Sequence, residues 1–127
     1  MKDKTYKTTV IATVQFEAVH NWPECPIPEV SYLRDLHRHM FWVTVEKEVH
    51  HDDRDVEIIC LKRDTLAALK QFSDHKCEED STPQKYCGAY LGRTSCETLA
   101  RYLCDELDLV SCRVLEDDEN GSVCYRS

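Results

Sequence analysis

The chain has 127 residues and a formal net charge of −8, with 42% hydrophobic and 31% charged residues. This length suits one domain over residues 1–127 with a core of its own. The negative charge argues against a nucleic-acid partner, because a phosphate backbone repels such a surface. No apolar run reaches the roughly 18 residues that a membrane span needs, and the start lacks the apolar segment of a signal peptide, so we expect a cytoplasmic protein.

The pattern of the N-terminal half predicts two long strands joined by a loop. Residues 5–19 alternate polar and apolar side chains and are rich in β-branched residues, which is typical of a strand. Residues 21–35 carry three prolines and no helical period, which predicts a loop. Residues 37–49 form the second predicted strand, and a polar turn at 50–55 leads into a short strand at 56–61.

Two helices are predicted next. Residues 63–75 carry apolar side chains at helical spacing. A long connection follows at 76–93, longer than most loops, which hints at a functional segment. The second helix, at 94–107, opens with Thr94 and has Glu97 three residues on, the pattern of a capping box.

The chain is predicted to end in two strands, at 109–116 and 122–126, joined by the turn sequence DDENG. Runs of strands therefore flank a run of helices, which favours an α+β fold over a parallel, doubly wound one. We expect an antiparallel four-stranded sheet with two helices on one face, in the order ββααββ.

Eight cysteines occur in this short chain, but no two have the CxxC spacing of a zinc knuckle. Several fall within apolar patterns, where a cysteine usually behaves as a small buried hydrophobe. Because we expect a cytoplasmic protein, we predict that most are reduced thiols. The cysteines are Cys25, Cys60, Cys77, Cys87, Cys96, Cys104, Cys112 and Cys124.

Three histidines are candidate metal ligands. His37 and His39 lie two apart on a predicted strand, so their side chains share one face. His20 ends the preceding strand, and antiparallel pairing would bring it beside them. Three histidines with an open fourth position suit catalytic zinc. The alternative is that the pair are polar residues on an exposed strand face. We interpret His50 and His51, in the charged turn, as solvated residues.

Several short motifs occur together in one order: FEAVH, LHRH, an Asp–His pair, TSCETLARYL, VLE and a terminal YR. This order resembles the 6-pyruvoyl and 6-carboxy tetrahydropterin synthase family, over residues 16–126. The resemblance implies the tunnelling fold (ββααββ), in which trimers or hexamers close into a barrel. It also implies active sites between subunits and a small pterin as the substrate.

The resemblance assigns roles to the metal and proton-handling residues. It implies a zinc ion bound by His20, His37 and His39. It implies that Asp74 and His75 handle protons as a pair, which makes chemical sense because a histidine held by an aspartate carries protons well near neutral pH.

The resemblance also assigns the substrate-binding residues. It implies that Glu116 anchors the pterin ring through its N–H groups and that Glu97 supports that pocket. This chain departs from the family at the catalytic cysteine, where Leu33 or Ser31 stands, depending on the spacing used. Cys25 in the same loop is the candidate replacement, although an unpaired loop cysteine is more often a bystander.

The function that the resemblance implies is a zinc-dependent lyase. It would release triphosphate from 7,8-dihydroneopterin triphosphate, as a 6-carboxytetrahydropterin synthase does on the route to queuosine-type 7-deazaguanines. One alternative is aldolase-like cleavage of a dihydropterin side chain. Another is a non-catalytic protein that binds a pterin or purine.

Overall fold

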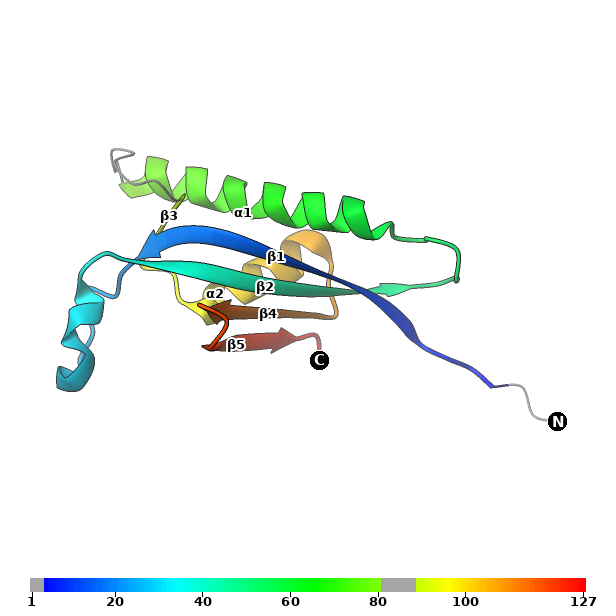
Figure 1. The fold of residues 1–127 in the computed structure, drawn as a ribbon, viewed down its shortest axis with the longest axis horizontal. Helices are drawn as coiled ribbons and strands as arrows, with labels where there is room; N and C mark the ends of the chain where they lie inside the picture. Colours follow the sequence, from blue (N-terminus) through cyan, green and yellow to red (C-terminus); the bar gives the residue numbers. More distant parts are fainter. Residues whose placement is uncertain (1–3, 81–88) are drawn as a thin grey trace.

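The computed structural model describes residues 4–80 and 89–127. Figure 1 shows a long, curved sheet with the helices along it. The elements in chain order are β1 (Thr8–His20), the short 3-10 helix η1 (Pro28–Arg34), β2 (His37–Val49), α1 (Ile58–Asp80), β3 (Ala89–Gly92), α2 (Cys96–Leu107), β4 (Ser111–Glu116) and β5 (Asn120–Tyr125).

The sheet has five strands in the order β3-β1-β2-β4-β5. β1 and β2 pair antiparallel along thirteen residues each, from Thr8 opposite Val49 to His20 opposite His37. β4 pairs antiparallel with β2 and with β5, whereas β3 runs parallel to β1. The sheet is therefore mixed.

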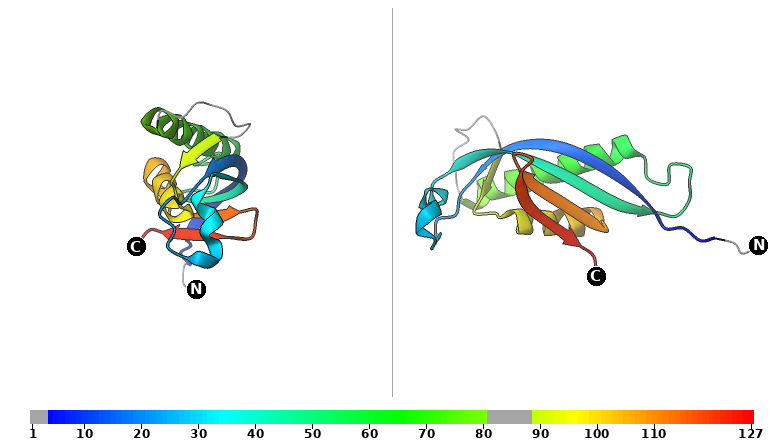
Figure 2. Two further views of the ribbon diagram at one scale, coloured as in Figure 1. Left: turned by 90° about the vertical axis from the view of Figure 1, so that its left-hand side faces the viewer. Right: turned by 60° about the horizontal axis from the view of Figure 1, so that its bottom comes forward.

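Both long helices cover the same face of this sheet, as the end-on view of Figure 2 shows. α1 packs against β1 and β3, and α2 packs against β4 and β5. Between helices and sheet lies one buried apolar cluster, whose burial is the main stabilising contribution to the fold. Its largest members include Phe41, Leu69, Leu91, Leu99, Leu103 and Val114.

The predicted fold class is wrong. Residues 4–80 and 89–127 form a five-stranded mixed sheet and three helices, in place of the antiparallel four-stranded ββααββ tunnelling fold. The prediction missed β3 because four residues are too few to display an alternating pattern within the long connection at 76–93. Part of that connection, residues 81–88 with Cys87, lies outside the described residues.

The short strand predicted at 56–61 is also wrong, because α1 begins within it at Ile58. The Glu57 carboxylate accepts hydrogen bonds from the backbone N–H groups of Ile59 and Cys60, at 2.9 Å each, and so satisfies donors of the first helical turn. The isoleucines that suggested a strand are each 52% exposed. Local capping decides the structure here, and β-propensity does not.

Other predictions agree with the structure. β2 has the predicted bounds, β1 ends one residue later than predicted, and α2 ends at Leu107 as expected. The predicted capping box of Thr94 and Glu97 is wrong, because the N-cap of α2 is Ser95, whose side chain accepts a hydrogen bond from the N–H of Thr98. No helix among residues 4–80 and 89–127 is long and apolar enough to cross a membrane.

Candidate metal centre

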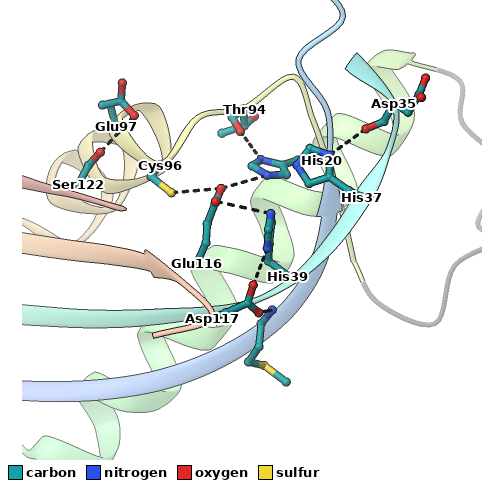
Figure 3. A network of polar contacts seen from close by, with 11 residues as sticks. His20, Asp35, His37, His39, Thr94, Cys96, Glu97, Glu116, Asp117 and Ser122 are labelled. Atoms are coloured by element: carbon teal, nitrogen blue, oxygen red, sulfur yellow. Dashed lines mark hydrogen bonds and ion pairs between the residues drawn. The ribbon is translucent and has the colours of Figure 1, made fainter. Parts of the chain in front are cut away.

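The pairing of β1 with β2 brings three histidines together at one end of the sheet. His20 lies directly opposite His37, and Ala18 lies opposite His39, so all three rings project from neighbouring positions. Their ring centroids are 4.6 to 5.2 Å apart. One nitrogen of each ring lies within 4.8 Å of the others, and the group could hold a metal ion. The grouping predicted from the sequence is confirmed (Figure 3).

Backbone carbonyls fix two of these rings. The Nδ1 atom of His20 lies 2.9 Å from the Thr94 carbonyl oxygen, and that of His37 lies 2.8 Å from the Asp35 carbonyl oxygen. A carbonyl oxygen only accepts hydrogen bonds, so each Nδ1 carries the proton and donates it. In the neutral ring the lone pair then belongs to Nε2, the atom left to bind a metal.

The third ring is fixed by a carboxylate. Nδ1 of His39 lies 2.7 Å from Oδ2 of Asp117, whose Oδ1 accepts the backbone N–H of Met40 at 3.0 Å. The hydrogen bond with His39 lowers the pKa of Asp117, so this carboxyl stays ionised near neutral pH. A carboxylate behind a ligating histidine is a common outer partner in zinc sites, where it orients the ring and raises its basicity.

The Nε2 atoms of His20 and His39 are buried and make no hydrogen bond of normal geometry. The Glu116 carboxylate nevertheless lies close, with 3.1 Å from its Oε2 to Nε2 of His20 and 3.5 Å from its Oε1 to Nε2 of His39. Buried ring nitrogens without an aligned partner are uncommon. A metal ion among them would satisfy both lone pairs, so the residues present fit a metal.

Charges around the rings favour a cation. Burial lowers the pKa of His20, but the contacts with Glu116 and Thr94 raise it by more, so the net shift is upward. The close contact with His20 lowers the pKa of Glu116 against the effect of burial. Burial, together with the neighbouring His20 and His39 rings, lowers the pKa of His37. Without a metal, the Glu116 carboxylate therefore favours the protonated form of His20.

A cavity of about 390 Å³ opens beside the histidines. His20, His37 and Glu116 line it on one side, next to the first turn of α2 and the start of β5. The other lining residues are Asn21, Trp22, Leu33, Arg93, Thr94, Ser95, Cys96, Glu97, Asn120, Gly121 and Ser122. The rings of His20 and His39 also contact Phe41 of the core, at 5.3 and 5.8 Å between centroids, so the site adjoins an apolar wall.

Both predicted substrate-binding carboxylates line this cavity. Oε1 of Glu97 accepts a hydrogen bond from the Ser122 hydroxyl at 3.1 Å, which ties α2 to β5. Glu116 comes from the last residue of β4 and reaches the histidines. The two acidic side chains thus have different surroundings, Glu97 beside a hydroxyl and Glu116 beside two imidazoles (Figure 3).

Cys96 belongs to the site, although the sequence gave no reason to single it out. Its Sγ donates a hydrogen bond to Oε2 of Glu116 at 3.7 Å. Burial, reinforced by Glu116, raises the pKa of this thiol to about 12, so it stays protonated. The cysteine lies in the apolar stripe of α2, where its spacing predicts only packing. Asp117 was missed for a similar reason, because it resembles the other acidic residues of its turn.

Asp74 and His75 do not meet the histidines within this chain. The predicted helix ended at His75, but α1 continues to Asp80, so the pair lies inside the helix. Asp74 pairs with Lys70 at 2.7 Å, and His75 pairs with Glu79 at 3.3 Å. Both side chains are exposed and line a different hollow, between α1 and α2. Their expected role as a proton-handling pair for the metal site finds no support in the single chain.

Cys25 does not line the cavity either. It is buried, with its Sγ 3.8 Å from the Ile27 carbonyl oxygen and 3.7 Å from that of Val30. These contacts fit a thiol that packs the loop between β1 and β2. Leu33 does line the cavity. An apolar side chain therefore occupies the cavity wall where the motif resemblance would place a reactive cysteine.

No family model and no curated protein matches this chain. Among solved structures, the crystal structure of an uncharacterized protein from Wolinella succinogenes is similar, with a TM-score of 0.64 and 13% sequence identity. The match covers 97% of this chain and 100% of that one. At this identity the likeness shows a shared fold alone.

Proposed function

We propose that the chain binds a zinc ion through the Nε2 atoms of His20, His37 and His39 and acts as a zinc-dependent enzyme. One observation carries the proposal: an acceptor holds each Nδ1–H, which leaves each Nε2 free for a metal. Imidazole nitrogens suit zinc, and three protein ligands are the usual set at a catalytic zinc site. The adjoining cavity gives a substrate access to that set.

For the substrate, we propose a dihydropterin with a hydroxylated side chain, and 7,8-dihydroneopterin triphosphate as the first compound to test. The order of sequence motifs supports this class, and Glu97 offers a carboxylate to the N–H groups of such a ring. When bound, zinc would supply polarisation of a side-chain oxygen. The carboxylates of Glu97 and Glu116 are the cavity groups able to take up a proton. Asp74 and His75 would contribute only from another copy in a homo-oligomer.

The charge of the cavity favours a second candidate, in which the substrate lacks the triphosphate. Among the cavity-lining residues in the described parts of the chain, Arg93 is the only lysine or arginine, and it already pairs with Glu24. Two carboxylates line the same cavity, so a triphosphate would meet repulsion with little compensation. This composition supports aldolase-like cleavage of an unphosphorylated dihydropterin, or its binding without turnover.

The first test is metal content followed by product analysis. We expect purified protein to carry one zinc ion per chain, measured by mass spectrometry of the metal. The zinc-loaded protein is then incubated separately with 7,8-dihydroneopterin triphosphate and with 7,8-dihydroneopterin. Triphosphate release with a carboxy- or pyruvoyl-pterin product supports the lyase, and loss of the side chain as an aldehyde supports the second candidate. If neither compound binds or reacts, the proposed substrate class is wrong.

A further inference from the structure

The Glu116 carboxylate lines the cavity and also contacts the histidine cluster. Its Oε2 lies 3.1 Å from Nε2 of His20, its Oε1 lies 3.5 Å from Nε2 of His39, and its side chain is 28% exposed. The other cavity carboxylate, Glu97, instead accepts a hydrogen bond from Ser122. A ring-anchoring role, as the motif resemblance implies, would leave the oxygens of Glu116 free to face a ligand.

These two distances match those between ligands of one small cation. A tetrahedral zinc ion with bonds of about 2.0–2.1 Å holds its ligand atoms about 3.3 Å apart. The contacts of Glu116 with His20 and His39 lie on either side of that value. Neither contact is an aligned hydrogen bond, and both nitrogens are buried. Each nitrogen thus lies at about ligand spacing from one oxygen of the carboxylate, Oε2 for His20 and Oε1 for His39, and a four-coordinate ion would take one of these oxygens.

We infer that Glu116 is the fourth protein ligand of the metal in the substrate-free protein. The inference rests on the proposed zinc site and adds to it a closed resting state. Three neutral imidazoles and one carboxylate would complete a four-coordinate zinc ion. An oxygen of the substrate would then displace Glu116 from the ion, and this carboxylate would be left beside the substrate.

Cys96 is the positioning residue for this ligand. Its Sγ–H donates to Oε2 of Glu116, and the cysteine is 6% exposed, so the donor is held in place by the packing of α2. Serine at this position keeps a donor of similar size, whereas alanine removes it. Cys96→Ala should therefore weaken metal binding more than Cys96→Ser does, without removing any ligand.

The test titrates cobalt(II) as a spectroscopic probe, and measures zinc affinity by chelator competition. The variants are Glu116→Gln and, as a matched control from the same cavity, Glu97→Gln. We expect Glu116→Gln to lower zinc affinity at least about tenfold and to change the visible cobalt spectrum, because the set of ligand atoms changes. Glu97→Gln should leave both unchanged. Circular dichroism of the metal-free variants checks that both fold.

The spectrum separates ligation from simple charge attraction. A nearby carboxylate that only attracts the cation would change affinity in Glu116→Gln while leaving the cobalt bands as in the wild type, and that result overturns the inference. Unchanged affinity and spectrum overturn it too, and return Glu116 to the role of ring anchor. If the wild-type protein binds neither zinc nor cobalt, the proposed zinc site itself is wrong. That outcome differs from one in which the protein binds metal but Glu116 is not a ligand.

Discussion

Two of the regions that carry histidines beside carboxylates differ in how firmly the fold holds them. At the end of the β1–β2 pair, His20 and His39 are packed against Phe41, and each ring is held through Nδ1. On α1, Asp74 and His75 are exposed and pair only with side chains four residues away. Strand register brings distant residues into one rigid cluster, whereas the helix displays its pair on a solvated face.

The largest effect should come from removing one ligand of the cluster. His39→Gln should lower zinc affinity at least about 100-fold, because it removes a ligating nitrogen and not an outer partner. His75→Gln, the matched change on α1, should leave zinc affinity unchanged. Chelator competition on both variants measures the difference. Equal losses of zinc affinity in the two variants would mean that the α1 histidine belongs to the metal site, which would contradict the contrast between the two regions.

A smaller loss should follow from releasing the His39 ring. Asp117→Asn removes the carboxylate behind Nδ1, and asparagine tolerates the positive φ of 56° at this position. We expect zinc affinity to fall about 10- to 100-fold, as for other partners behind ligating histidines. Asp118→Asn is the control, since Asp118 is its exposed neighbour with a φ of 58°. A full-affinity Asp117→Asn protein would show that the carboxylate does not orient the ring.

Zinc affinity should also depend on pH with a predictable sign. The contacts with Glu116 and Thr94 raise the pKa of His20 despite its burial, so its Nε2 keeps a proton up to a higher pH than usual. Zinc must displace that proton, and affinity therefore falls as the pH falls through this pKa. One displaced proton gives about a tenfold change per pH unit. A flat profile between about pH 5.5 and 7.5, around the ordinary histidine pKa, would contradict the assignment of His20 as a ligand.

The smallest effect is expected on α1. Asp74→Asn breaks the pair with Lys70, but both side chains are largely exposed and the pair is screened by solvent. We expect no measurable change in the midpoint of urea unfolding and none in zinc affinity. A clear loss of activity with unchanged zinc binding would instead indicate that α1 reaches the metal site of a second copy, which would support the proposed homo-oligomer.

The sequence was sufficient for the histidine cluster because strand periodicity and antiparallel pairing together fix which side chains meet. It was not sufficient for β3, since four residues at 89–92 show no period and their parallel pairing with β1 is a long-range contact. The start of α1 depends on the side chain of Glu57 and overrides the β-branched residues that follow. A long-range contact decides the structure at β3, whereas a local cap outweighs β-propensity at the start of α1.

The partners of the cluster were harder to predict than its ligands. The acceptors of His20 and His37 are backbone carbonyls, and every residue has one, so residue type carries no signal. The position of Cys96 in the apolar pattern of α2 predicts only that it is buried. Its contact with Glu116 depends on how α2 packs against β4. Asp117 is one of several acidic residues in its turn, and only the folded chain distinguishes it.

The backbone origin of those two acceptors bears on how the site can evolve. A substitution at Thr94 or Asp35 changes the side chain but leaves the backbone carbonyl oxygen in place. Most single substitutions there should therefore preserve the orientation of His20 and His37, provided that the backbone conformation is unchanged. Among the three ring orientations, only that of His39 depends on a side chain, Asp117. Natural variation that tunes metal binding without abolishing it has its most direct route through residue 117.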